Sequence, residues 1–165
     1  DADAMFRNWA NDPQVTKYLS WEPHKDVEET KQILEGWIKS YESKDFYTWA
    51  IARKEDEGNI IGSISVPQLN QKAGRVTVGY CLGRNWWGHK IMKEAFAELI
   101  RFFFEVEGAN RVEALHDTRN VNSGKVMAAC GLKKEGTLRR YGWNNQGICD
   151  ECIYGMVASD YFEGK

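Results

Sequence analysis

The chain has 165 residues, with 22 Lys and Arg against 24 Asp and Glu, and 42% of its residues are hydrophobic. A chain of this length predicts one domain, residues 1–165, with a sizeable core. The balanced charge gives no basic surface for a nucleic acid, no apolar run approaches the ~20 residues of a membrane span, and no signal peptide is visible. We therefore expect a cytoplasmic protein without nucleic-acid or membrane partners.

The four cysteines are expected to be reduced rather than to form disulfides or a metal site. Cys149 and Cys152 have C-x-x-C spacing, but no second pair or His cluster lies nearby, and DECIYGMV has the pattern of a strand. Residues three apart on a strand point to opposite faces, so the two sulfurs could not share a metal without distortion. The sequence therefore predicts no metal site.

The N-terminal part has helical spacing. Residues 1–10 place apolar side chains at helical intervals, and Pro13 ends that element because the residue before proline avoids the helical region. Asp26 is expected to cap a second helix, where Glu29 completes a capping box. The apolar line of this helix consists of Ile33, Trp37 and Tyr41, with Leu34 and Ile38 beside it.

Strand spacing follows in three segments, FYTWAIARK (46–54), GNIIGSISV (58–66) and RVTVGYCL (75–82), which predict an antiparallel meander. Helical period returns after Gly88, and Gly108 is a natural stop. The apolar positions of this long helix are Met92, Phe96, Leu99, Phe103 and Val106.

The last third alternates again. A strand is expected at 111–117, a short helix at about 122–130, and two strands at 132–140 and 150–157 that flank a turn at 144–147. The order α-α-β-β-β-α-β-α-β-β predicts an α/β domain with a mixed sheet.

The turn before the long helix is a candidate anion site. The first amides of a helix have no intrahelical partner, and the helix dipole adds partial positive charge. Gly88 lets the backbone approach an anion closely, and His89 and Lys90 add possible cationic contacts. The alternative is that Gly88 serves only the turn, while Trp86 and Trp87 anchor it to the core.

The surrounding pattern resembles the GNAT acetyltransferase superfamily, particularly its RimJ/RimL-type branch, which acetylates protein N-termini and small amines. The residues that carry the likeness are Trp87-Gly88 followed by Glu94-Ala95, then Asn120, Ser123 and Val126, then Gly131-Leu132 and Glu135-Gly136, and the opening WANDPQVTKYLSWEPH. They are similar to the branch's W-G-x-G-x-x-x-E-A loop, its N-x-x-S-x-x-V…G-F…E-G pattern, and its first helix with the acceptor-side loop. The likeness covers nearly the whole chain.

The resemblance implies a GNAT fold, with a mixed central sheet flanked by about four helices. The family's first strand would be missing or upstream of residue 1. The implied function is transfer of the acetyl group of acetyl-CoA to a primary amine by direct attack in a ternary complex. The amine would be a protein N-terminal α-amine, a polyamine or another small amine. The alternative is a non-catalytic acyl-CoA-binding sensor or interaction domain. A homodimer is possible, since members often pair.

The resemblance also implies site residues. The pantetheine arm would pass between residues 80–82 and 112–116, with an oxyanion donor near Cys81, and the pyrophosphate would lie on the amides of 85–91. The expected acetyl-CoA contacts are Cys81, Leu82, Asn85, Trp87, Gly88, His89, Lys90, Ile91, Met92, Asn120 and Ser123. Trp21 and Glu22 would bind the acceptor, although Glu22 could equally be a solvated carboxylate.

The catalytic groups are less fully specified. Ser123 would help the thiolate leave, or it would only cap a helix. Asp117 is a candidate base, with His116 beside it. Three positions depart from the family pattern: Asn85 replaces a Gln or Arg, Lys90 replaces a small residue, and Met127 stands where many members carry a tyrosine acid.

Overall fold

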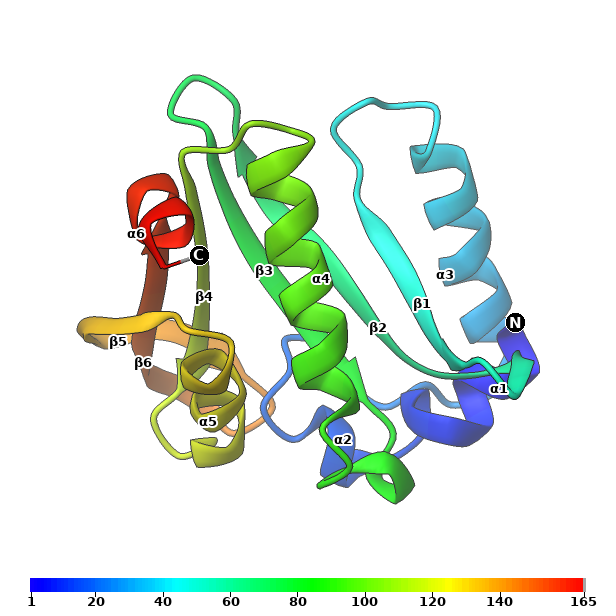
Figure 1. The fold of residues 1–165 in the computed structure, drawn as a ribbon. Helices are drawn as coiled ribbons and strands as arrows, with labels where there is room; N and C mark the ends of the chain where they lie inside the picture. Colours follow the sequence, from blue (N-terminus) through cyan, green and yellow to red (C-terminus); the bar gives the residue numbers. More distant parts are fainter. Residues whose placement is uncertain (165) are drawn as a thin grey trace.

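The computed structural model describes residues 1–164. Its elements, labelled in Figure 1, are α1 (Ala2–Met5), the π-helical turn η1 (Phe6–Ala10), α2 (Pro13–Thr16), α3 (Val27–Ser40), β1 (Thr48–Arg53), β2 (Asp56–Asn70), β3 (Arg75–Leu82), the 3-10 turn η2 (Arg84–Trp86), α4 (Ile91–Glu105), β4 (Arg111–Asp117), α5 (Val121–Ala129), β5 (Lys133–Asn144), β6 (Gly147–Val157) and α6 (Ala158–Glu163). Among these residues, no helix combines the length and apolar character that a bilayer span requires.

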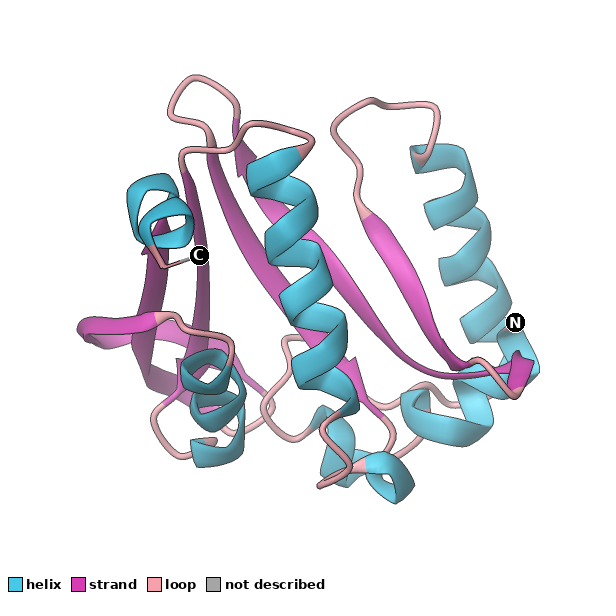
Figure 2. Cartoon of the chain, in the orientation of Figure 1, coloured by secondary structure: helices cyan, strands magenta, loops and turns pink. Residues whose placement is uncertain are grey.

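The six strands form one mixed sheet in the order β1-β2-β3-β4-β6-β5. The β3–β4 pair is parallel and the other neighbours are antiparallel. Figure 2 shows this sheet with helices around it, and α4 runs along it in front of β2 and β3. The predicted mixed α/β architecture is therefore confirmed. In the described chain β1 is an edge strand, and α1 is the first element.

Two apolar clusters cover the two faces of the sheet. Tyr80 and Leu82 of β3 pack in the larger cluster with α4, whereas Cys81 between them packs in the smaller cluster with α1, η1 and α3. Alternation along a strand explains this division. The predicted line of α4 is buried from Met92 to Phe103, but Val106 is exposed because the helix has already ended at Glu105.

The N-terminal segment differs from the expectation in two places. Pro13 ends the first helical element and also begins α2, where the Asp12 side chain accepts a hydrogen bond from the Gln14 amide at 2.8 Å. Proline suits the first position of a helix because its missing N–H would have no partner there. In α3 the buried face is centred on Thr30, so Ile33 of the predicted apolar line is exposed.

The expected start of α3 is present. The Asp26 carboxylate accepts a hydrogen bond from the Glu29 amide at 2.9 Å, and the Glu29 carboxylate accepts one from the Lys25 amide at 2.7 Å. This arrangement closes a capping box, with the return bond reaching one residue farther back than usual. At the other end of the chain, α6 was not predicted from the sequence.

Candidate active site

The central sheet opens between β3 and β4. Their pairing ends at Val78 and Ala114, although β3 stays paired with β2 up to Leu82, and β4 stays paired with β6 up to Asp117. The ends of the two strands therefore diverge. Residues 79–82 face residues 115–117 across an opening that no strand fills.

Backbone groups of β3 are exposed to this opening. The Gly83 amide donates to the Ile61 carbonyl at 2.8 Å, so Gly83 and Cys81 direct their backbone groups toward β2. In an antiparallel pair the direction alternates with each residue. The backbone groups of Tyr80 and Leu82 therefore point into the opening. The Trp87 indole N–H donates to the Leu82 carbonyl at 2.7 Å, which holds the following turn against the strand.

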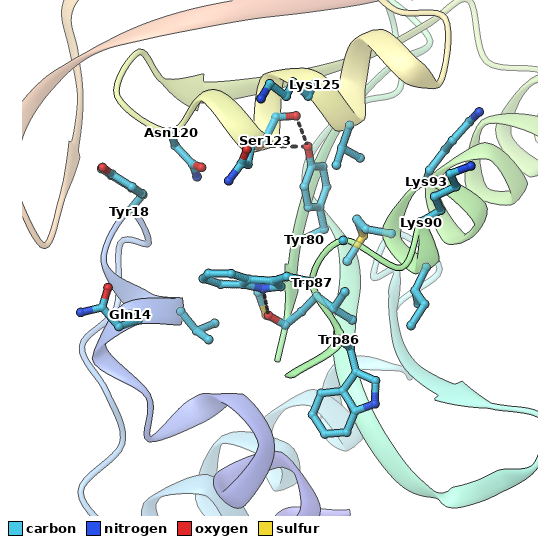
Figure 3. A pocket seen from close by; sticks show the side chains of 18 of the residues that line it. Gln14, Tyr18, Tyr80, Trp86, Trp87, Lys90, Lys93, Asn120, Ser123 and Lys125 are labelled. Carbon is cyan, nitrogen blue, oxygen red and sulfur yellow. Dashed lines mark hydrogen bonds between the residues drawn. The ribbon is translucent and has the colours of Figure 1, made fainter. Parts of the chain in front are cut away.

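A cleft of about 650 Å³ lies at the opening (Figure 3). Four parts of the chain form its walls: the segment around α2, the end of β3, the turn before α4 with the first residues of that helix, and the start of α5. Cys81, Leu82, Trp87 and Gly88 line it from β3 and the turn. Lys90, Ile91 and Met92 line it from the start of α4, and Asn120 and Ser123 from the start of α5.

The start of α4 is left open to the cleft. No side chain caps this helix, and the first backbone bond of the turn runs from the Glu94 amide to the Lys90 carbonyl at 3.1 Å. The preceding amides are therefore available to a ligand. Gly88 has φ +80°, and a Cβ added to it would meet no atom within 4 Å. This glycine thus has both the left-handed backbone that glycine tolerates and open space beside it.

Lys90 adopts the left-handed region as well, with φ 64°. A side chain in this conformation costs roughly 1–2 kcal/mol relative to an ordinary helical one. This cost is a physical reason for a small residue at the position, and here a lysine sits there instead. Its side chain lines the cleft.

The charge of the cleft has one sign. Lys17, Lys90, Lys93 and Lys125 line it, and no Asp or Glu among residues 1–164 does so. Lys93 and Lys90 lie beside the start of α4, and Lys125 lies on α5 (Figure 3). The Lys90 and Lys93 ammonium groups beside uncapped helix amides suit a polyanion such as a diphosphate.

Ser123 forms hydrogen bonds inside the cleft. Its hydroxyl lies 3.0 Å from the Tyr80 phenol oxygen, and the Tyr80 phenol donates to the Ser123 carbonyl at 3.0 Å. The hydroxyl therefore does not cap the helix, which has no side-chain cap. Burial raises the pKa of the Tyr80 phenol far above its usual value, so the phenol stays protonated. Met127 lies beneath in the core, fully buried.

Asp117 does not line the cleft. Its carboxylate is buried and accepts hydrogen bonds from Nε and Nη2 of Arg119, from the Arg119 amide, and from the Asn144 side chain at 2.8 Å. Burial would raise the pKa of this carboxyl, but the bonds from Arg119 and Asn144 outweigh it and hold the pKa well below its ordinary value. Such a carboxylate is a weak base with its oxygens occupied, which argues against the expected catalytic role.

Other predicted residues also lie outside the cleft. Asn85 and His89 are exposed, and Asn85 borders a separate polar hollow near Asp12. Trp21 packs against His24 with ring centroids 5.2 Å apart, and Glu22 is exposed in the same loop. The residues of this N-terminal part that do line the cleft come earlier in the chain and are Gln14, Val15, Lys17, Tyr18 and Leu19.

His116 is not positioned for proton transfer with a ligand in the cleft. Its Nδ1 lies 2.8 Å from the Asp117 carbonyl, and its Nε2 is buried without a hydrogen-bond partner among the described residues. A Cβ on Gly124 would come within 2.6 Å of that nitrogen, so α5 covers it closely. Residues 1–164 also contain no cluster of three or more His, Cys, Asp or Glu side chains that could hold a metal ion.

Comparison with known proteins assigns the class. The family model of the acetyltransferase (GNAT) domain matches residues 1–133. The uncharacterized N-acetyltransferase p20 of Bacillus licheniformis is 32% identical over 162 residues, which cover 98% of this chain and 89% of the relative. This chain therefore belongs to the GNAT acetyltransferase family, whose members use acetyl-CoA as the acetyl donor.

More distant relatives agree. The ribosomal protein uS5-alanine N-acetyltransferase of Escherichia coli is 24% identical over 152 residues, 88% of this chain and 77% of that protein. The microcin C7 self-immunity acetyltransferase MccE, solved in complex with acetyl-CoA and AMP, has the same fold with a TM-score of 0.83 at 21% identity, covering 94% of this chain and 86% of that one. The protein is thus an acetyl-CoA-dependent N-acetyltransferase, and a non-catalytic acyl-CoA sensor is not favoured.

Two features of the cleft were not anticipated. Tyr80 was expected only within the strand 75–82, where residues 80–82 would border the pantetheine arm, and Lys17 and Tyr18 were not singled out. The sequence carries one signal for Tyr80, because its hydroxyl is the only polar group in the line Val76, Val78, Tyr80 and Leu82. Nothing local identifies Lys17, whose position depends on how its loop packs.

Proposed function

We propose that acetyl-CoA binds in this cleft and donates its acetyl group to the α-amine of a peptide N-terminus. The observation that carries the proposal is the meeting of two features. The uncapped amides of α4 lie at one part of the cleft with Lys90 and Lys93, and the opened edge of β3 lies beside them. Phosphates suit the first feature, and an extended amide-bearing arm suits the second.

The backbone does most of the binding in this proposal. The amides that precede Glu94 hold the pyrophosphate, and Lys90, Lys93 and Lys125 add charge. The backbone groups of Tyr80 and the amide of Leu82 pair with the pantetheine arm, and one of the two amides faces the thioester oxygen as an oxyanion donor. The Asn120 side chain makes no capping bond and lies free to contact the arm.

Ser123 assists the leaving group. The amine nitrogen bonds to the thioester carbonyl carbon, the carbon–sulfur bond breaks, and the sulfur needs a proton or a hydrogen-bond donor. The Ser123 hydroxyl is the donor with a place in the cleft, next to the Tyr80 phenol. The proton lost by the amine passes to water, because no carboxylate of residues 1–164 lines the cleft.

The absence of a cleft carboxylate among residues 1–164 favours an amine with a low pKa. Neutralising a lysine amine with pKa ~10.4 at neutral pH costs about 4 kcal/mol, whereas an α-amine with pKa ~8 costs about 1 kcal/mol. A site that relies on water for deprotonation therefore suits α-amines. The uS5-alanine acetyltransferase relative, whose name specifies an alanine of a ribosomal protein, supports the same class.

The test is acetyl-CoA consumption on a panel of amines. We expect turnover with short peptides that have free N-termini and little with peptides whose N-terminus is blocked but whose lysine is free. Spermidine and an aminoglycoside complete the panel. Tight acetyl-CoA binding without turnover on any of these amines would contradict the proposal.

A further inference from the structure

The two ends of the cleft differ in what surrounds them. Lys90 and Lys93 lie on one side, Tyr18 and Gln14 lie on the opposite side, and Tyr80 and Trp87 lie between them (Figure 3). In the proposed function the phosphates lie at the start of α4, and the thioester is at the far end of the pantetheine arm. The amine therefore enters beside Tyr18.

This acceptor end carries a positive charge that no Asp or Glu of residues 1–164 offsets. The Lys17 ammonium lies 5.2 Å from the Tyr18 ring centroid, and the Arg119 guanidinium carbon lies 6.0 Å from the same centroid. Arg119 is paired with Asp117 through a 2.6 Å contact, so its charge is balanced. Lys17 has no ion pair with any Asp or Glu of the described chain, and Glu22 of the same loop does not line the cleft.

The loop that carries Lys17 is held in place from across the chain. The Asn145 side chain donates to the carbonyls of Thr16 at 2.9 Å and of Trp21 at 2.8 Å. The Asn145 amide also donates to the Leu19 carbonyl at 3.2 Å. Three bonds from the β5–β6 turn thus fix the segment on both sides of Lys17. These bonds fix the backbone that carries Lys17, which limits the region that its ammonium can reach.

We infer that the acceptor is a primary α-amine that carries a carboxylate close by, and that Lys17 binds this carboxylate at the mouth of the cleft. This inference rests on the proposed function and specifies its substrate class. A polyamine would place further cations against Lys17 and the other lysines of the cleft, which repel it. A carboxylate beside the amine forms an ion pair with Lys17 instead.

The experiment compares amidated tetrapeptides that differ only in the second residue, Ala-Glu, Ala-Gln and Ala-Lys. Since the C-terminus is amidated, the side chain is the sole carboxylate. The carboxylate could instead be the α-carboxylate of an amino acid, and a comparison of kcat/KM for free alanine and alaninamide tests this second source. We expect kcat/KM to be at least fivefold higher for the Glu peptide than for the Lys peptide at low salt, and the ratio to shrink at 0.5 M salt.

Three variants assign the effect to Lys17. Lys17→Glu should reverse the preference for the Glu peptide, and Lys17→Gln should abolish it. The control is Lys39→Glu, at an exposed residue in the last turn of α3. It changes the net charge as much as Lys17→Glu does and should retain the preference. Melting curves verify that each variant is folded. If Lys17→Glu does not fold, Lys17→Gln alone tests the role of Lys17. Equal turnover of the three peptides together with equal turnover of alanine and alaninamide, or a preference that Lys17→Gln leaves intact, would overturn the inference while the proposed function stands. Wild-type enzyme that acetylates no amine would instead overturn the proposed function itself.

Discussion

The hydroxyl groups of Tyr80 and Ser123 lie 3.0 Å apart, although 43 residues separate them in the chain. The Tyr80 phenol has one proton and donates it to the Ser123 carbonyl, so in this arrangement the Ser123 hydroxyl donates to Tyr80. Ser123 must turn its proton away from Tyr80 to serve a thiolate. The hydrogen bond from Ser123 to Tyr80 is then lost, which costs about 1 kcal/mol. A charge-assisted hydrogen bond to the thiolate is stronger and offsets this loss.

Ser123→Ala should lower kcat and leave the affinity for acetyl-CoA nearly unchanged. Acid-type assistance contributes ~10²–10⁴-fold, and a serine hydroxyl is a poor acid, so we expect a loss near 10²-fold. The check is kcat and melting temperature on the same preparation, with acetyl-CoA affinity measured separately. Normal kcat with a lower melting temperature would mean that the hydroxyl only stabilises the fold.

Tyr80→Phe tests the partner of this hydrogen bond. The variant keeps the aromatic ring against Phe96 but removes the hydroxyl group, so the Ser123 hydroxyl loses the hydrogen-bond partner that it has in the structure. We expect a smaller fall in kcat, about tenfold or less. The double variant should be no worse than Ser123→Ala alone, because both residues act through one bond. Independent, multiplying losses would contradict a shared role.

Lys90→Gly should separate strain from binding. Glycine adopts φ 64° without penalty, so the melting temperature should rise by about 2–4 °C for a gain near 1 kcal/mol. The loss of the ammonium should weaken acetyl-CoA binding by up to about fivefold. Lys90→Ala is the matched control, since it loses the ammonium but keeps the strained backbone. A Gly variant that binds acetyl-CoA as tightly as wild type would show that the ammonium points away from the phosphates.

Asp117→Asn should cost stability without changing turnover per folded enzyme. Removing the buried charge of this ion pair should destabilise the fold by about 2–3 kcal/mol, a figure that is discounted because its partner Arg119 is half exposed. A carboxyl whose pKa is lowered on folding contributes its stability above the unfolded value near 3.9 and loses it as the pH falls further. The wild-type protein should therefore lose stability below about pH 4 more steeply than the variant. A large fall in kcat for Asp117→Asn would restore this residue as the catalytic base.

Period and turn chemistry predicted much of the fold. The line from Met92 to Phe103 and the alternation along β3 mark buried faces, because burial of one face imposes its spacing on the sequence. The glycine-bearing start of α4 was predictable for a similar reason. A helix start that leaves its amides open needs local backbone freedom, and Gly88 provides it at φ +80°.

The side chains of the cleft were less predictable, since their positions depend on contacts between distant segments. Asp117 was expected only as a candidate base near the opening, with His116 beside it. Its pKa is set instead by Arg119 and by Asn144, which is 27 residues away. Lys17 lies at the cleft because Asn145, more than 120 positions away in the sequence, donates hydrogen bonds to the backbone of its loop. No local pattern records such contacts.

The most direct test of acetyl-CoA binding in the cleft is a calorimetric measurement of acetyl-CoA affinity for two variants, Gly88→Val and Gly108→Val. Both glycines have a positive φ, +80° and +65°, and neither has an atom within 4 Å of an added Cβ, so the two substitutions impose similar backbone strain. Gly108 lies beyond the far end of α4, roughly 22 Å along a helix of 15 residues. We expect at least a tenfold loss of affinity, ~1.4 kcal/mol, for Gly88→Val and wild-type affinity for Gly108→Val. Equal affinities in the two folded variants would contradict a pyrophosphate bound on the backbone at the start of α4.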